Sequence, residues 1–282
     1  MLLGVHISGV ANISDAPAKA AALGCNTMQI FSRAPQRWRE RALGASEISR
    51  FNQEKERFKI KPLSVHVSYL INLASPDPKL YASSIKAYIE DIREAEGLKA
   101  DYIVTHMGSH KKTGEEAGIE RFTSALNKII KKTADSPIGI LLENTAGSGS
   151  WLGYRFSHHG RIISGLEDKR RVGICLDTAH AYAAGYDLAS KDGLEAMLDE
   201  IDGAAGLNKL KLIHLNDARD SLGSHHDRHE HIGKGRIGRM GMKRIINHPK
   251  LRELPFILET PKTNERSDKV NLKNVRSLRS RE

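Results

Sequence analysis

The 282-residue sequence contains only two cysteines, Cys25 and Cys175, and they lie far apart in the chain. Cys175 sits in the apolar run VGICLD, so we expect both thiols to be buried and reduced. A secreted domain held together by disulfides is therefore excluded. Aromatic residues make up only 5% of the chain, while hydrophobic residues reach 39%, which predicts a globular protein with a mainly aliphatic core.

Long apolar stretches are also missing. No run of about 18 apolar residues occurs, so no transmembrane helix is predicted. The first ten residues, MLLGVHISGV, lack the basic start and the cleavage site of a secretory signal. We therefore expect a cytoplasmic protein without membrane contact. No low-complexity linker divides the chain, which predicts a single domain over residues 1–282.

Negative charge is scarce relative to positive charge. The chain has 34 Asp and Glu against 44 Lys and Arg, which gives a net charge of +10. Such an excess favours polyanionic partners, of which nucleic acid is the first candidate. Many basic proteins are simply soluble, however, so charge alone does not decide between the two interpretations.

Short apolar runs rich in Val, Ile and Leu recur along the chain, and each ends in a polar or small residue. Segments with helical periodicity lie between them, for example 76–100 and 118–134, and residues 267–282 are expected to form a C-terminal basic helix or tail. Eight strand–helix units predict an α/β fold, the TIM (β/α)₈ barrel; an open doubly wound sheet is the alternative, because counting strands does not prove closure. The runs cover residues 2–8, 27–32, 63–68, 102–108, 138–145, 172–180, 209–217 and 255–260.

Six of these runs carry a metal-type ligand at or near their C-terminal end, where a TIM barrel places its chemistry. A lone histidine at a strand end is usually structural, but six coincidences on one rim are harder to dismiss. Crowded imidazoles and carboxylates are costly unless a cation neutralises them, and such mixed sets suit zinc, with manganese or iron as alternatives. The candidates are His66, His106, Glu143, Asp177, His180, His214 and Glu259.

The glycine-flanked segment HHDRHEHIGKG (225–235) concentrates four histidines and an aspartate. Asp227 and His229 are two residues apart, so an extended loop would present both on one side, where they would complete a site with His180. We expect the other histidines of the segment to face solvent or to support the ligands. Nine ligands are too many for one zinc ion and suit two or three ions.

Three motifs in combination closely resemble the endonuclease IV family of apurinic/apyrimidinic (AP) endonucleases. They are LDTAHAYAAGYDL (176–188), HLND (214–217) and DRHEHIGKG (227–235), and further matching stretches include SYLINLASPD (68–77) and LLENTAGSGSWLG (141–153). The resemblance implies a monomeric TIM barrel with three zinc ions. It also implies cleavage of double-stranded DNA on the 5′ side of abasic sites, leaving a 3′-hydroxyl and a 5′-deoxyribose phosphate, and trimming of blocked 3′ ends.

The resemblance also implies how the nine ligands are shared. His66, His106 and Glu143 would serve one zinc ion, and Glu143 would bridge to a second ion that also takes Asp177, His214 and Glu259. The third ion would take His180, Asp227 and His229. Manganese is an alternative to zinc. Glu143 and Glu259 are also our candidates for catalytic residues.

The candidate DNA contacts come from three loops. Tyr69 matches a position at which the family inserts a side chain into the base stack. In RAPQRWRE (33–40), Arg37 directly before Trp38 matches the family's other DNA-penetrating element in a shifted register, and Gln36 is the alternative occupant. Arg228, between two ligand candidates, is a further candidate. Ordinary packing is the competing interpretation for Tyr69 and Trp38.

Two other classes of protein stay open. A metal-dependent sugar isomerase or epimerase on the same barrel would use a Glu, Asp, His, Glu set, which Glu143, Asp177, His214 and Glu259 could imitate. Such an enzyme needs one or two metal ions and has no use for the other five candidates. A non-catalytic DNA-binding protein on a decayed enzyme scaffold is disfavoured by the complete ligand set.

Overall fold

The computed structural model describes residues 1–8, 12–31, 38 and 42–280. Its main feature is a sheet of eight parallel strands in the order β1-β10-β7-β6-β5-β4-β3-β2. The strands are β1 (Leu3–Val5), β2 (Met28–Phe31), β3 (Leu63–His66), β4 (Tyr102–His106), β5 (Gly139–Glu143), β6 (Val172–Asp177), β7 (Leu210–His214) and β10 (Phe256–Leu258).

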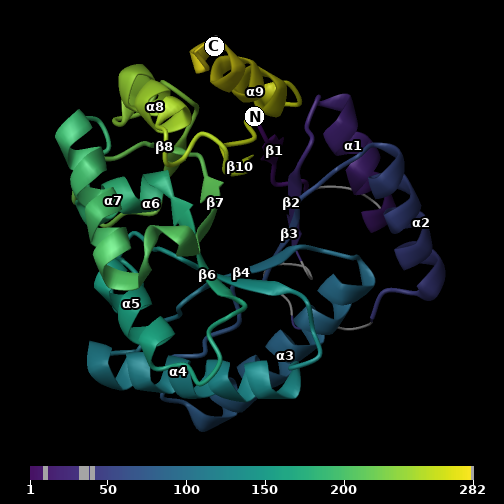
Figure 1. The fold of residues 1–282 in the computed structure, drawn as a ribbon, viewed down its shortest axis with the longest axis vertical. Helices are drawn as coiled ribbons and strands as arrows, with labels where there is room; N and C mark the ends of the chain where they lie inside the picture. Colours follow the sequence, from purple (N-terminus) through teal and green to yellow (C-terminus); the bar gives the residue numbers. More distant parts are fainter. Residues whose placement is uncertain (9–11, 32–37, 39–41, 281–282) are drawn as a thin grey trace.

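The two edge strands, β1 and β2, meet and close the sheet. His6 and Gln29 form a parallel bridge just beyond β1, and the backbone N–H of Ile7 donates to the carbonyl of Gln29 at 2.8 Å. The strands therefore form a barrel, seen in the centre of Figure 1 with helices around it. The TIM-barrel prediction is confirmed, and the alternative of an open doubly wound sheet is wrong.

Eight helices of the described residues cover the outside of the barrel (Figure 1). The segment expected to be helical at 76–100 begins where Asp77 caps it: the Asp77 carboxylate accepts hydrogen bonds from the N–H groups of Lys79 and Leu80. Within the described residues, no helix has both the length and the apolar character needed to cross a membrane. The helices are α1 (Ala16–Ala22), α2 (Ala45–Arg57), α3 (Pro78–Gly97), α4 (Glu115–Lys132), α5 (Phe156–Ser164), α7 (Lys191–Ala205), α8 (Gly238–Asn247) and α9 (Ser267–Leu278).

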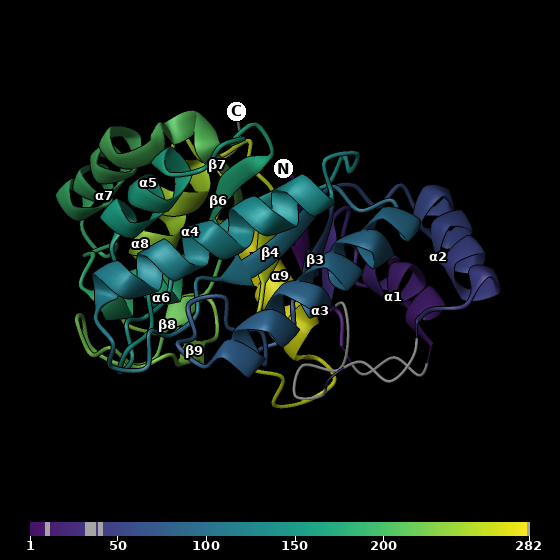
Figure 2. The ribbon, with the colours of Figure 1, turned by 90° about the horizontal axis from the view of Figure 1, so that it is seen from below.

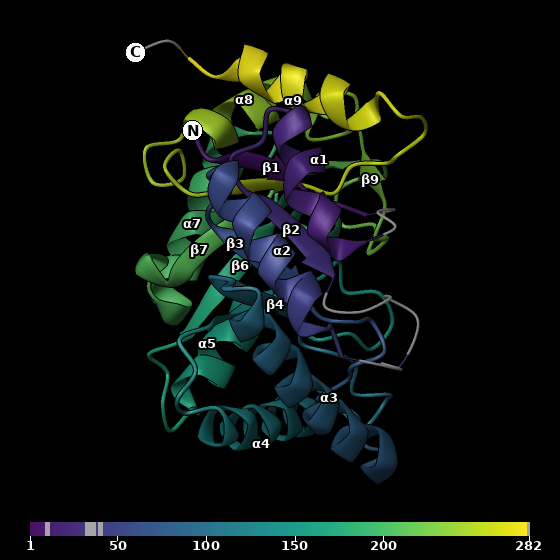
Figure 3. The ribbon, with the colours of Figure 1, turned by 90° about the vertical axis from the view of Figure 1, so that its right-hand side faces the viewer.

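A ninth helix, α6 (Thr178–Ala184), follows β6 directly, and a two-stranded antiparallel ribbon pairs β8 (Asp217–Ala218) with β9 (His229–Glu230). Both side views place β9 beyond the C-terminal ends of the barrel strands (Figures 2 and 3). The chain between these two short strands contains Asp227. The ribbon therefore brings a segment from late in the sequence over the rim at which the predicted ligands lie.

The interior of the barrel is layered. Five side chains, from Val104, Leu141, Cys175, Leu212 and Ile257, form a fully buried apolar cluster inside it. Each stands two positions before a candidate ligand in the sequence, and residues two apart on a strand point to the same side. The apolar layer therefore forms the floor, and the next layer toward the C-terminal rim consists of ligand-type side chains. Both cysteines are buried and free, as expected.

Candidate metal centre

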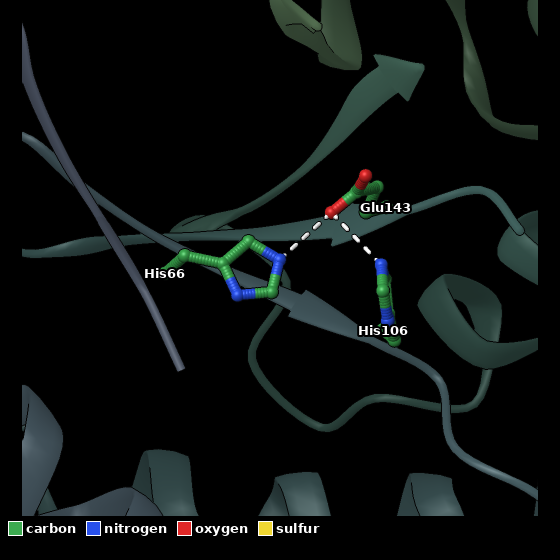
Figure 4. A group of neighbouring side chains, drawn as sticks. All are labelled: His66, His106 and Glu143. Atoms are coloured by element: carbon green, nitrogen blue, oxygen red, sulfur yellow. Dashed lines mark hydrogen bonds and ion pairs between the residues drawn. The ribbon is translucent and has the colours of Figure 1, made fainter. Parts of the chain in front are cut away.

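The first group of candidates joins the ends of β3, β4 and β5. His66 Nε2 lies 3.0 Å from Glu143 Oε2, and His106 Nε2 lies 3.3 Å from the same oxygen. Figure 4 shows both rings pointing a nitrogen at this carboxylate. His66 Nδ1 lies 2.7 Å from the carbonyl of Val67, to which it can donate, and this leaves Nε2 free to face Glu143.

The second group shares Glu143 with the first. His214 Nδ1 lies 3.0 Å from Glu143 Oε1 and 3.2 Å from Glu259 Oε2. One ligand atom each from Glu143, Asp177, His214 and Glu259 lie within 4.8 Å of one another. The two oxygens of Glu143 therefore face different groups, which is the geometry of a carboxylate that bridges two cations.

The third group lies toward the ribbon. Ligand atoms of Asp177, His180 and His229 lie within 4.8 Å of one another. Asp227 Oδ1 joins them at 3.0 Å from His180 Nε2 and 3.5 Å from His229 Nε2. Because the Asp227 side chain is 55% exposed, this end of the centre opens to solvent. The structure thus brings all nine predicted side chains together, and it places Asp177 between the second and third groups.

The electrostatics of the centre suit a set of bound cations. Within the described part of the chain, the ion pairs of Glu143, Asp177 and Glu259 are all with histidines. Burial raises the pKa of Glu143, but His214 and His106 outweigh it and hold that pKa well below its usual range. Burial lowers the pKa of His180, but Asp177, Asp227 and Glu143 outweigh it and raise that pKa well above its usual value.

The chemistry of these side-chain donors fits divalent metal ions. Buried carboxylates facing imidazole nitrogens are stable only if protons or cations lie between them. Nitrogen and oxygen donors in this mixture are the ligands that zinc takes in proteins, and manganese is compatible with them. The residues present therefore fit divalent cations.

Buried polar residues that sequence reasoning missed hold these ligands in place. Gln29 Nε2 donates to Glu259 Oε1 at 2.7 Å, and Gln29 Oε1 lies 2.9 Å from His214 Nε2. Asn216 Nδ2 donates to Asp177 Oδ2 at 2.7 Å. The available signal for Gln29 was a polar residue in the middle of an apolar strand. His6 Nδ1 also lies 3.0 Å from Glu259 Oε1.

Asp217 anchors the glycine-rich segment that follows β9. Its buried carboxylate accepts hydrogen bonds from the backbone N–H groups of Gly233, Gly235 and Ile237, each at 3.0 Å, and from Gly238 at 3.2 Å. Burial raises the pKa of Asp217, and these hydrogen bonds oppose that rise. A Cβ on Gly235 would lie 2.3 Å from the carbonyl oxygen of Ala218, so only glycine fits there.

Of the residues predicted to contact DNA, the structure describes Tyr69, Trp38 and Arg228. Tyr69 is 52% exposed, and its ring stacks on His106 with centroids 6.0 Å apart. Trp38 is 42% exposed, whereas Arg37 and Gln36 lie outside the described residues. The Arg228 side chain is exposed, with Nε 3.8 Å from Asp220 Oδ2.

A cavity of about 460 Å³ opens beside the metal centre, and Tyr69 and Trp151 line it together with His106, His180 and Asp227. Sequence reasoning did not single out Trp151. Of the remaining histidines in the 225–235 segment, His225 and His226 are exposed, as expected. His231 is half-buried, with Nδ1 2.9 Å from Asn271 Nδ2.

Comparison with known proteins decides the family. The profile of the family described as "Xylose isomerase-like TIM barrel" matches residues 17–281. The protein named "Probable endonuclease 4" from Methanoculleus marisnigri is 44% identical over 278 residues, which span 99% of both chains. The chain belongs to the endonuclease IV family. The crystal structure of endonuclease IV from Thermus thermophilus superposes with a TM-score of 0.86 at 35% identity, covering 99% of this chain and 98% of that one.

Endonuclease IV shares its barrel with sugar-converting enzymes. A D-tagatose 3-epimerase-like protein superposes with a TM-score of 0.74 over 98% of this chain and 96% of that one. Its identity is only 20%, so this likeness shows the fold alone. The predicted endonuclease IV membership is confirmed, and the rival sugar isomerase finds support only at the level of the barrel.

Proposed function

We propose that this endonuclease IV family member repairs double-stranded DNA by hydrolysing the phosphodiester bond 5′ to abasic sites. The products would be a 3′-hydroxyl and a 5′-deoxyribose phosphate, and the same centre would trim blocked 3′ ends. The observation that carries the proposal is the convergence of nine ligand-type side chains in three overlapping groups. A sugar isomerase needs only the second group, whereas phosphodiester hydrolysis uses charge neutralisation on both the attacked and the leaving side of phosphorus.

Three zinc ions would occupy these groups, with manganese as an alternative. His66, His106 and Glu143 would hold the first; Glu143, Asp177, His214 and Glu259 the second; and His180, Asp227 and His229 the third. Bound zinc would supply a nucleophile at neutral pH and would neutralise charge on the phosphate and on the leaving oxygen.

The carboxylates Glu143 and Glu259 would act as the catalytic residues of the chain. Burial raises the pKa of Glu259, but His214 outweighs it and keeps that pKa well below its usual range, as it does for Glu143. Both groups are therefore ionised at neutral pH and can orient water through their oxygens. Gln29 would hold Glu259 in the orientation that this role requires.

The substrate would be bound by the exposed rim. Tyr69 lines the cavity and is exposed, so its ring could stack on a base beside the lesion, and the cavity would receive the extruded abasic sugar. Arg228 and the net charge of +10 would attract the phosphate backbone. Arg37 or Gln36, with Trp38, would enter the duplex from the loop after β2. We further propose that residues 1–282 act as one domain, as a monomer, in the cytoplasm.

A duplex with a single tetrahydrofuran abasic analogue tests the proposal. Zinc-loaded protein should nick the damaged strand on the 5′ side of the analogue, and a chelator should abolish the nick. Turnover of ketohexoses or aldopentoses without nicking would support an epimerase instead. A mobility shift of the duplex without any cut would indicate a non-catalytic binding protein, and either result would overturn the proposed function.

A further inference from the structure

Two consecutive lysines on the catalytic rim have a backbone conformation that lysine rarely adopts. Lys111 and Lys112 have φ angles of 47° and 67°. The N–H of Thr113 donates to the carbonyl of His110 at 3.0 Å across them. Two central residues with positive φ inside an i to i+3 hydrogen bond define a type I′ turn, which strongly favours Asn-Gly. This turn therefore places Lys-Lys where backbone energetics favour a different pair.

Lys59 and Lys99 also have positive φ, but both stand at helix ends, where this conformation is ordinary. That explanation does not apply to Lys111 and Lys112. Lys59 follows α2 and Lys99 follows α3, where the chain reverses with the N–H of Ile60 donating to Lys55 and the N–H of Ala100 donating to Ala95. Left-handed residues at such helix ends are common because they satisfy the last carbonyls. Lys111 and Lys112 follow a strand and cap no helix. Strain of this kind persists where the surroundings enforce it, and it clusters at functional sites.

The neighbouring rim loops hold the turn rigidly. Ser109 N–H donates to Asn72 Oδ1 at 3.0 Å, which ties the turn to the loop of Tyr69. His110 N–H donates to the carbonyl of Ser150 at 3.0 Å, which ties it to the loop of Trp151. The turn is thus fixed to both loops whose aromatic side chains line the cavity.

The two ammonium groups are exposed and free of acidic partners. Among the described residues, no carboxylate lies within ion-pair distance of Lys111 or Lys112. The next acids along the chain, Glu115 and Glu116, pair instead with Tyr154 and Arg161. Lys112 is six residues from His106, so its Cα lies within about 20 Å of that ligand. We therefore expect a duplex seated at the metal centre to pass near both lysines.

We propose that the Lys111–Lys112 turn is a preorganised contact for the phosphodiester backbone of one arm of the DNA duplex. The inference rests on the proposed function, because it assumes that the metal centre acts on DNA. Lysine is a point charge that binds phosphate without reading base sequence. Fixing two such charges on a rigid turn reduces the conformational entropy lost on binding, at the expense of folding stability.

The test replaces the lysines with the pair that the turn favours. The variant K111N/K112G should melt about 2–4 °C higher than the wild type because the strain is relieved. Its affinity for undamaged and abasic duplexes should fall, and the slope of log K against log salt should become shallower by about 2. The ratio of the wild-type DNA affinity to that of the variant should accordingly fall about tenfold between 50 and 200 mM salt. The control K59G/K99G removes two lysines of the same conformation at the opposite end of the barrel.

The outcomes separate this proposal from the proposed function. A K111N/K112G slope equal to that of K59G/K99G would overturn the phosphate contact, even if both variants nick abasic DNA. A shallower slope in K111N/K112G alone would establish the contact, even if no protein nicks the duplex. Failure of the wild-type protein to bind duplex DNA at 50 mM salt would overturn the contact as well.

Discussion

Gln29 and Glu259 come from nearly opposite ends of the sequence, and a 2.7 Å hydrogen bond joins Gln29 Nε2 to Glu259 Oε1 inside the barrel. Gln29 is fully buried, and its other amide atom faces His214 Nε2. The amide oxygen can only accept, so His214 donates from Nε2 and presents Nδ1 as the ligand atom. One amide thus orients two candidate metal ligands.

Replacing this amide should weaken metal binding without unfolding the protein. Gln29→Leu should lower zinc affinity by about 10–100-fold, as loss of a hydrogen bond behind a ligand typically does. Competition with a chromophoric chelator measures the affinity. Thr27→Val is the matched control, because it removes a buried hydroxyl that donates a 2.6 Å hydrogen bond to the carbonyl of Pro62. This variant should bind zinc like the wild type. Equal affinities for both variants would show that Gln29 does not position the ligands.

Asp217 should be needed for the stability of the glycine-rich segment that follows β9. In Asp217→Ala, the N–H groups of Gly233, Gly235, Ile237 and Gly238 lose their acceptor, and the free energy of unfolding should fall by about 2–4 kcal/mol. Urea unfolding measures this loss. Asp217→Asn keeps one acceptor oxygen and should lose less. If Asp217→Ala were as stable as Asp217→Asn, the loop would have another anchor.

His159 should make the protein less stable in mild acid. Burial lowers the pKa of His159 to about 3 from an ordinary value of 6.5. The unfolded chain binds a proton at His159 more readily than the folded chain does. The free energy of unfolding is therefore highest above pH 6.5 and falls as the pH drops toward 3. Between pH 7 and pH 5 the loss should be about 2 kcal/mol from this residue. His159→Gln should show a correspondingly smaller fall in urea unfolding over the same interval; an unchanged fall would assign the effect to other groups.

Tyr69 should contribute to DNA recognition and not to metal binding. Tyr69→Ala should weaken the abasic duplex complex by roughly 10–100-fold, because stacking on a base is worth about 1–3 kcal/mol. Tyr69→Phe keeps the ring and should bind almost as well as the wild type. Fluorescence anisotropy gives the affinities, and elemental analysis should find the same zinc content in all three proteins. A loss of zinc in Tyr69→Ala would indicate instead that the ring stabilises His106.

The sequence was sufficient to predict the barrel and the nine converging side chains, and the reason is physical. In parallel strands, residues two apart point to the same side, so a ligand that follows a buried residue by two positions, as His106 follows Val104, must enter the barrel. The strand pattern predicted the barrel but did not prove that the sheet closes, which the structure shows in the bridge between His6 and Gln29.

Residues that act through tertiary contacts were harder to find. Gln29, Asn216 and Trp151 acquire their roles only when segments far apart in the sequence meet. The strained turn at Lys111 and Lys112 could not be predicted from the sequence either, because its two residues contradict the residue preferences by which turns are recognised. Local rules therefore identified the ligands, whereas the residues that orient them required the folded structure.

The metal content of the purified protein tests the central claim most directly. Elemental analysis after zinc loading and removal of excess metal should give three zinc ions per chain, and Glu143→Gln should lose at least one because its carboxylate faces two groups. Removal of the metal with a chelator should abolish nicking of abasic DNA, and added zinc should restore it. One zinc ion or none per chain, with nicking unaffected by chelation, would contradict the account.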